Sequence, residues 1–209
     1  MKGTVLLFGY SYYDKYYLNP AEEIVKNLHG LIVDGYVLEG MVLPVSVKKV
    51  MNIVAREIMH RDDVVLVIGL GMSPIIDSPV LELAFTNIMF FNKPDIDGNI
   101  YRFIKIIDDG PFVVTTNLPF KEIYERCNNI GAGIRPGLSS GTYLCNILGY
   151  LIAYYTRMRG IKGGFIHVPP HTDLAMKLGL TNYRSLNLMM DTIICTIKAS
   201  LETIEKTFE

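Results

Sequence analysis

The residues best suited to catalysis lie in the stretch 139–150, which has the sequence SSGTYLCNILGY. Its serines and threonine favour the start of a helix, and Gly141 permits a tight turn. Apolar residues then recur at the spacing of a buried helix face, namely Leu144, Ile147, Leu148, Leu151 and Ile152. Cys145 is therefore expected in the first turn of a helix, where unpaired N–H groups and the helix dipole favour a thiolate over a thiol. The same N–H groups are suited to hold an oxyanion.

A cysteine nucleophile needs a base near its sulfur and a third group that orients the base. His167, in the segment FIHVPP, is the candidate base. Glu82, in the segment VLELAF, is the candidate orienting group, because a carboxylate in an apolar strand is costly unless it is paired. Together Glu82, Cys145 and His167 supply the acid, the nucleophile and the base of a cysteine hydrolase.

Each of the three residues also has an ordinary structural interpretation. Free cysteine is among the most buried residue types, so Cys145 also fits a small core position. His167 also fits a hydrogen-bonded core or interface histidine, and Glu82 fits a solvent-facing position on an alternating strand. The catalytic hypothesis therefore depends on whether the fold brings the three side chains together.

The hydrophobic pattern predicts alternating strands and helices. Strands are predicted at 4–9, 31–37, 64–68, 80–88, 112–116 and 164–168, with loops at 69–71 and 90–109. Helices are predicted at 21–28 after Asn19-Pro20, at 46–59 with Ser46 as cap, at 119–128, from about 144 onward, and at 182–206. Short connections between such elements predict an α/β fold with a mostly parallel sheet and helices on both faces.

In open parallel sheets, functional residues gather at the carboxyl ends of the strands. The tyrosine-rich loop 10–13, the loop 69–73 and His167 all follow or end predicted strands. Cys145 begins its helix near the same edge of the sheet. The sequence therefore predicts one site at this edge.

Composition limits the classes of protein that this chain can represent. Its 209 residues suffice for one domain, 1–209. Hydrophobic residues make up 50%, yet no apolar run approaches the ~20 residues of a membrane span, and the apolar stretch near Met1 is too short for a signal peptide. A net charge of -1 does not provide the excess of basic residues that binding of nucleic acid requires. We expect the apolar excess at a subunit interface rather than in a membrane.

The chain has three cysteines, Cys127, Cys145 and Cys195, which are widely spaced and form no CxxC pair. The four histidines do not combine with them at the spacing of a zinc site. We therefore expect no metal, three reduced thiols and a cytoplasmic location.

Two segments resemble the pyrrolidone-carboxylate (pyroglutamyl) peptidases, namely 141–146 (GTYLCN) and 164–169 (GFIHVP). The resemblance extends over most of the chain. Further similar positions are 5–10 with Asn19-Pro20, Leu43-Pro44-Val45, Asn87, Pro94-Asp95 and Gly98-Asn99.

This resemblance implies removal of an N-terminal pyroglutamyl residue from peptides, without metal or cofactor. Cys145 would be the nucleophile, His167 the general base and then acid, and Glu82 the carboxylate that orients it. The implied fold is a three-layer α/β/α sandwich. The implied assembly is a homo-oligomer, either a dimer or a tetramer, with a peptide or small acyl-amide as substrate.

The chain departs from the family pattern around the predicted substrate pocket. Tyr10 and Tyr13 stand where the family has phenylalanines, and with Tyr143 their rings are expected to hold a flat substrate ring. Leu70 stands at the position of a glutamine that recognises the lactam. Two family arginines correspond to Leu83 and Asn92.

These departures leave alternatives open. They are a cysteine hydrolase of altered acyl specificity and a non-catalytic small-ligand-binding protein on the same scaffold. A phosphorolytic enzyme ranks last, because the loops after the strands contain almost no arginine.

Overall fold

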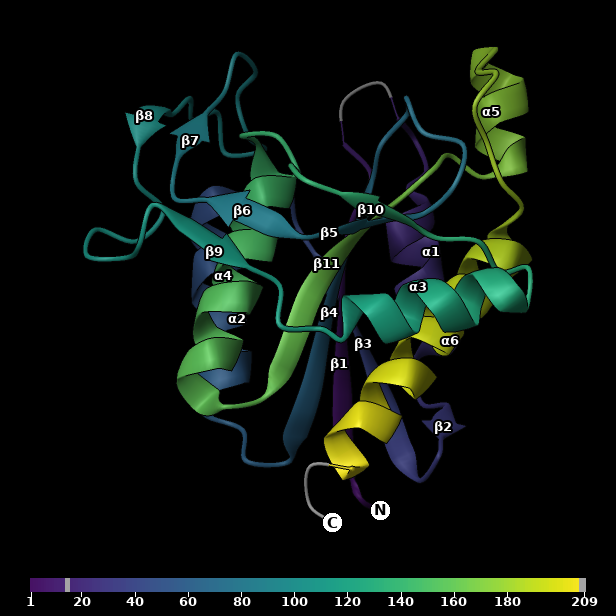
Figure 1. Ribbon diagram of the computed structural model, residues 1–209. Helices are drawn as coiled ribbons and strands as arrows, with labels where there is room; N and C mark the ends of the chain where they lie inside the picture. Colours follow the sequence, from purple (N-terminus) through teal and green to yellow (C-terminus); the bar gives the residue numbers. More distant parts are fainter. Residues whose placement is uncertain (14–15, 207–209) are drawn as a thin grey trace.

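A seven-stranded sheet runs through the centre of the computed structural model, which describes residues 1–13 and 16–206 (Figure 1). Its parallel middle consists of β1 (Gly3–Tyr10), β3 (Tyr36–Leu43), β4 (Val64–Met72) and β11 (Lys162–Val168). The edges are β2 (Ile32–Val33), β5 (Val80–Glu82) and β10 (Arg135–Gly137), which give the order β10-β5-β11-β4-β1-β3-β2. β5 runs antiparallel to β11.

Two short antiparallel ladders lie beside the main sheet (Figure 1). One pairs β6 (Ala84–Thr86) with β9 (Val113–Thr115), and the other pairs β7 (Met89–Phe90) with β8 (Arg102–Ile104). They belong to the long segment that leads from β5 towards the helix of the predicted nucleophile.

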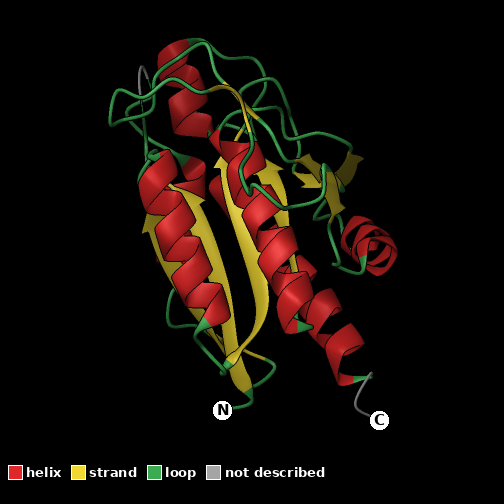
Figure 2. Cartoon of the chain, turned by 90° about the vertical axis from the view of Figure 1, so that its left-hand side faces the viewer, coloured by secondary structure: helices red, strands yellow, loops and turns green. Residues whose placement is uncertain are grey.

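Helices cover both faces of the sheet, which confirms the predicted α/β/α sandwich. One face carries α2 (Val47–Met59) and α4 (Leu144–Arg159). The other carries α1 (Pro20–Leu28), α3 (Phe120–Asn129) and α6 (Leu186–Glu205). Figure 2 shows the long strands side by side behind helices that cover them. Among the described residues, no helix is long and apolar enough to cross a membrane.

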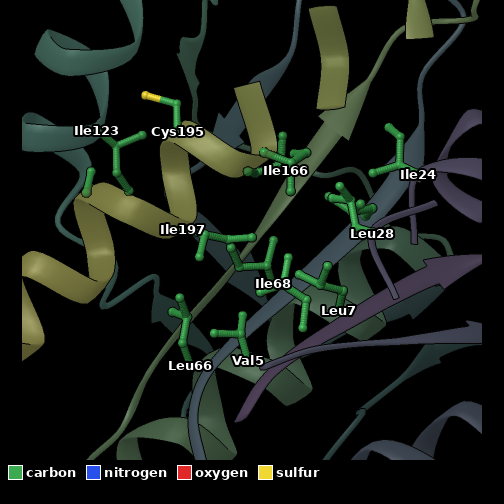
Figure 3. Close-up of a cluster of buried hydrophobic side chains, with 14 of the residues drawn as sticks. Val5, Leu7, Ile24, Leu28, Leu66, Ile68, Ile123, Ile166, Cys195 and Ile197 are labelled. Atoms are coloured by element: carbon green, nitrogen blue, oxygen red, sulfur yellow. The ribbon is translucent and has the colours of Figure 1, made fainter. Parts of the chain in front are cut away.

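Side-chain alternation along the strands divides the core into two clusters. In β1, Val5 and Leu7 pack towards α1 and α6, whereas Leu6 and Phe8 pack towards α2 and α4. Figure 3 shows the first cluster, which combines strand residues with Ile24 and Leu28 of α1, Ile123 of α3 and Ile197 of α6. This division decides on which side of the sheet each functional side chain lies.

Several local predictions are confirmed. Asn19 caps α1, because its side chain accepts a hydrogen bond from the Ala21 N–H, and Pro20 is the first helical residue. Ser46 caps α2 by accepting from the Lys49 N–H.

The predicted loop at 69–71 is wrong, since β4 continues through it to Met72. The glycines there serve close packing rather than a turn. A Cβ on Gly69 would lie 2.7 Å from Cδ1 of Ile152, so the missing side chain lets α4 approach the sheet.

Three other element predictions need correction. The strand expected at 31–37 reverses at Asp34 and Gly35, both with positive φ, and β3 continues to Leu43. The strand expected at 80–88 is divided at Leu83 between β5 and β6. The pattern also missed β10 and α5 (Thr172–Leu178), and the expected loop at 90–109 contains β8.

The prediction of three reduced thiols is wrong, because Cys127 and Cys195 form a disulfide. They lie 68 positions apart, but α3 and α6 pack against each other, and Figure 3 shows Cys195 near Ile123 of α3. Cys145 is the free cysteine of the described chain.

We predict that replacing Cys127 and Cys195 together by alanine lowers the free energy of unfolding by about 2–4 kcal/mol, because the bridge restricts the unfolded chain. Turnover per folded molecule should stay unchanged, since both residues belong to the core cluster on the face opposite α4. Chemical denaturation with and without reductant measures the first effect. A double variant as stable as the oxidised native protein would contradict the prediction.

Candidate active site

His167 and Glu82 lie side by side because β5 pairs antiparallel with β11. Ile166 and Val168 of β11 pack into the α1/α3/α6 core, so the intervening His167 lies on the side of α4. Glu82 Oε1 lies 2.8 Å from His167 Nδ1, and both residues are buried. This hydrogen bond fixes the ring so that Nε2 faces away from the carboxylate.

Cys145 lies in the first turn of α4, as predicted, and is beside His167. A Cβ on Gly71 would lie 2.9 Å from Cys145 Sγ, and Gly71 pairs with His167 in the β4–β11 ladder. The sulfur therefore lies against Gly71, the residue of β4 that is paired with His167. The structure thus brings Cys145, His167 and Glu82 together.

The electrostatic surroundings favour a protonated His167. Burial lowers its pKa, but the negative charge and hydrogen bond of Cys145 and those of Glu82 raise it more, so that the pKa reaches about 9. The ring thus holds a proton at neutral pH, between the Cys145 sulfur and the Glu82 side chain.

The helix that carries Cys145 is anchored at its first turn. Asn146 is buried, accepts a hydrogen bond from the Thr86 N–H, and donates to the carbonyls of Thr86 and Ile88. The helix cap Tyr143 makes no side-chain capping bond. The first N–H groups of α4 have no partner within the helix, so they are suited to stabilise an oxyanion.

A cavity of about 240 Å³ opens beside Cys145. Tyr10, Tyr13 and Tyr143, the three tyrosines predicted to hold a ring, all line it. The remaining lining residues are Ser11, Tyr16, Asn19, Val45, Met72, Pro74, Lys93 and Leu144.

The hydroxyls of the three tyrosines all donate to backbone carbonyls. Tyr10 donates to the Leu144 carbonyl at 2.7 Å. Tyr13 and Tyr143 both donate to the carbonyl of Pro94, at 2.7 Å and 3.0 Å. Burial first, and then the charge of nearby Cys145, raises the pKa of Tyr10, so its hydroxyl stays neutral.

The structure does not support Leu70 as a substrate-binding residue. Its side chain is fully buried in the α1/α3/α6 core, on the face of the sheet opposite α4. Met72, two residues further along β4, lines the cavity instead. Leu83 and Asn92 do not line the cavity either, whereas Lys93 does.

Pro74 and Lys93 also line the cavity, although the sequence patterns did not predict them. Their positions in the sequence could have indicated a place in the site, because Pro74 follows the loop 69–73 and Lys93 directly precedes the Pro94-Asp95 pair. Within residues 1–13 and 16–206, no cluster of His, Cys, Asp and Glu side chains could hold a metal ion.

Comparison with known proteins gives a consistent result. A family model described as "Pyroglutamyl peptidase" matches residues 3–207. "Pyrrolidone-carboxylate peptidase 1" of Saccharolobus solfataricus is 33% identical over 202 residues, which cover 96% of this chain and 93% of that protein. "Pyrrolidone-carboxylate peptidase" of Thermococcus litoralis is 30% identical and covers 97% and 94%.

Solved structures agree with these relatives. The pyrrolidone carboxyl peptidase from Thermococcus litoralis superimposes with a TM-score of 0.92 at 30% identity, over 98% of this chain and 96% of that chain. Pyrrolidone carboxyl peptidase from Pyrococcus furiosus gives a TM-score of 0.90 at 25% identity, over 96% and 99%. By the family model and by relatives that match nearly its whole length, this chain belongs to the pyroglutamyl peptidase family.

Proposed function

We propose that this protein is a cysteine peptidase that removes an N-terminal pyroglutamyl residue from peptides. The observation that carries the proposal is the position of Cys145 beside the hydrogen-bonded pair His167–Glu82, at the wall of a ring-lined cavity of about 240 Å³. Membership of the pyroglutamyl peptidase family supports the same activity.

In the first half of the proposed reaction, His167 already holds the proton of the Cys145 thiol, and the sulfur attacks the acyl carbon of the pyroglutamyl residue. N–H groups at the start of α4 stabilise the oxyanion. His167 then protonates the leaving amine, the C–N bond breaks, and a thioester remains on Cys145.

In the second half, water attacks the thioester while His167 accepts a proton from it. The C–S bond breaks, and His167 keeps this proton beside the released sulfur, which restores the starting state. Glu82 holds the imidazole ring in one orientation throughout, through its hydrogen bond to Nδ1. Free pyroglutamate is the second product.

The cavity walls suit a small flat ring. Tyr10, Tyr13 and Tyr143 present aromatic surface, and Val45 and Met72 add apolar contacts. A homo-oligomer is also part of the proposal, whereas the Cys127–Cys195 disulfide removes the argument from reduced thiols on which the cytoplasmic location rested. An apolar groove at the edge of the sheet, with Phe120 and Tyr124 half exposed on α3, supports a subunit contact.

We predict that Cys145→Ala abolishes release of a fluorogenic amine from its pyroglutamyl amide, with a loss of about 10³-fold or more, because the nucleophile is gone. In the native protein, an alkylating reagent should label Cys145 without prior reduction, since Cys127 and Cys195 are bonded to each other. Selective labelling without turnover would favour a hydrolase for another acyl group. Neither labelling nor turnover would favour a ligand-binding protein.

We predict that His167→Ala lowers kcat/KM by about 10²–10⁴-fold, and that Glu82→Gln lowers it by about tenfold to a hundredfold, because Glu82 acts only through the ring. Glu57→Gln is a matched control, since Glu57 is a nearly buried glutamate on α2 that pairs with Arg61. Steady-state kinetics on all three variants provide the measurement. A Glu82→Gln rate equal to that of the control would remove Glu82 from the mechanism.

We predict that activity falls as pH rises through about 9, because His167 with a raised pKa keeps its proton below that pH and loses it above. In Glu82→Gln the fall should begin at lower pH, since one cause of the raised pKa is removed. A profile of kcat/KM against pH for both proteins tests this. If kcat/KM falls at the same pH in Glu82→Gln as in the native protein, the prediction is wrong.

A further inference from the structure

Tyr10 lies where a substrate at the proposed active site could contact its side chain. Tyr10 ends β1, lines the cavity and is only 4% exposed. Its hydroxyl donates to the carbonyl of Leu144, the residue directly before the nucleophile Cys145. The inference below rests on the proposed function.

A tyrosine hydroxyl has one proton to donate and lone pairs that accept hydrogen bonds. Because the proton of Tyr10 is held by the Leu144 carbonyl at 2.7 Å, the oxygen can offer a ligand only acceptor capacity. Burial keeps the phenol neutral, so the proton remains on the oxygen. The cavity therefore presents an acceptor beside the nucleophile.

The chemistry of a pyroglutamyl group places a donor in the same region. Its ring nitrogen is bonded to the same carbon that carries the acyl group under attack. The ring N–H is thus separated from the reacting carbon by only two bonds. A group that recognises this N–H must lie close to Cys145 Sγ.

Among the three tyrosines, Tyr10 meets this requirement best. Its hydroxyl is bonded to the residue next to Cys145, whereas the hydroxyls of Tyr13 and Tyr143 are bonded to Pro94 in another loop.

We propose that the Tyr10 hydroxyl oxygen accepts a hydrogen bond from the lactam N–H and so makes the enzyme specific for an acyl ring that carries a donor next to the scissile carbonyl. A phenylalanine at this position would supply the aromatic wall without the acceptor. With Leu70 buried in the opposite core, this hydroxyl supplies the polar contact that Leu70 does not.

The selectivity should appear between two substrates that differ at one atom. In the lactone analogue, a ring oxygen replaces the N–H, so that a lone pair faces the Tyr10 oxygen and no hydrogen bond forms. A buried polar group left without its partner discriminates strongly. We expect the native enzyme to prefer the lactam amide over the lactone amide by about tenfold or more in kcat/KM.

The test compares release of the same fluorogenic amine from the pyroglutamyl amide and from the 5-oxotetrahydrofuran-2-carbonyl amide. In Tyr10→Phe, we expect the preference to shrink to about threefold or less, through loss of rate on the lactam alone. Because both rates scale with the amount of folded enzyme, partial misfolding does not change their ratio. An unchanged ratio would overturn the proposal.

Tyr150→Phe is the matched control. Tyr150 is a buried tyrosine of α4 whose hydroxyl likewise donates to a carbonyl, that of Pro111 at 2.8 Å, and it does not line the cavity. The Tyr150→Phe variant should prefer the lactam over the lactone as strongly as the native enzyme does. An equal fall in both variants would overturn the proposal, because the effect would then be structural.

Binding measurements separate this inference from the proposed function. Calorimetry on Cys145→Ala, with and without Tyr10→Phe, compares the amides of pyroglutamic acid and of the lactone acid as ligands. Preferential lactam binding that Tyr10→Phe removes would support the inference even if the native protein shows no turnover. Equal binding of both ligands, or binding of neither, would overturn it.

Discussion

The hydrogen bond between Glu82 and His167 depends on the pairing of β5 with β11, and the rest of the site is arranged around it. Glu82 Oε1 bonds the imidazole, while Oε2 has no hydrogen-bond partner within the described chain. An unpaired buried carboxylate would be costly, but here the protonated ring lies against it. The edge strand β10 covers this side and brings Gly137 against the carboxylate.

Local signals predicted much of the fold correctly. Asn19, Pro20 and Ser46 marked helix starts, because capping is decided by neighbouring residues. The proximity of Cys145 and His167 could be anticipated from a strand end and a helix start at one edge of a parallel sheet. The position of Glu82 depends instead on the antiparallel pairing of β5 with β11.

The errors concern features that only packing decides. Leu70 was assigned to the pocket. The face of the sheet on which its side chain lies follows from the strand register, and a shift of one residue would reverse that face. The disulfide was missed because the contact of α3 with α6 is tertiary. Met72 and Lys93 reach the cavity from a strand end and a loop whose paths no periodicity describes.

One carbonyl group links two walls of the cavity. The oxygen of Pro94 accepts from both Tyr13 and Tyr143, so both of its lone pairs are occupied. The adjoining Asp95 is buried and accepts from the Val47 N–H at the start of α2. The positions of the two rings are therefore coupled through one peptide unit, which α2 anchors from outside the cavity lining.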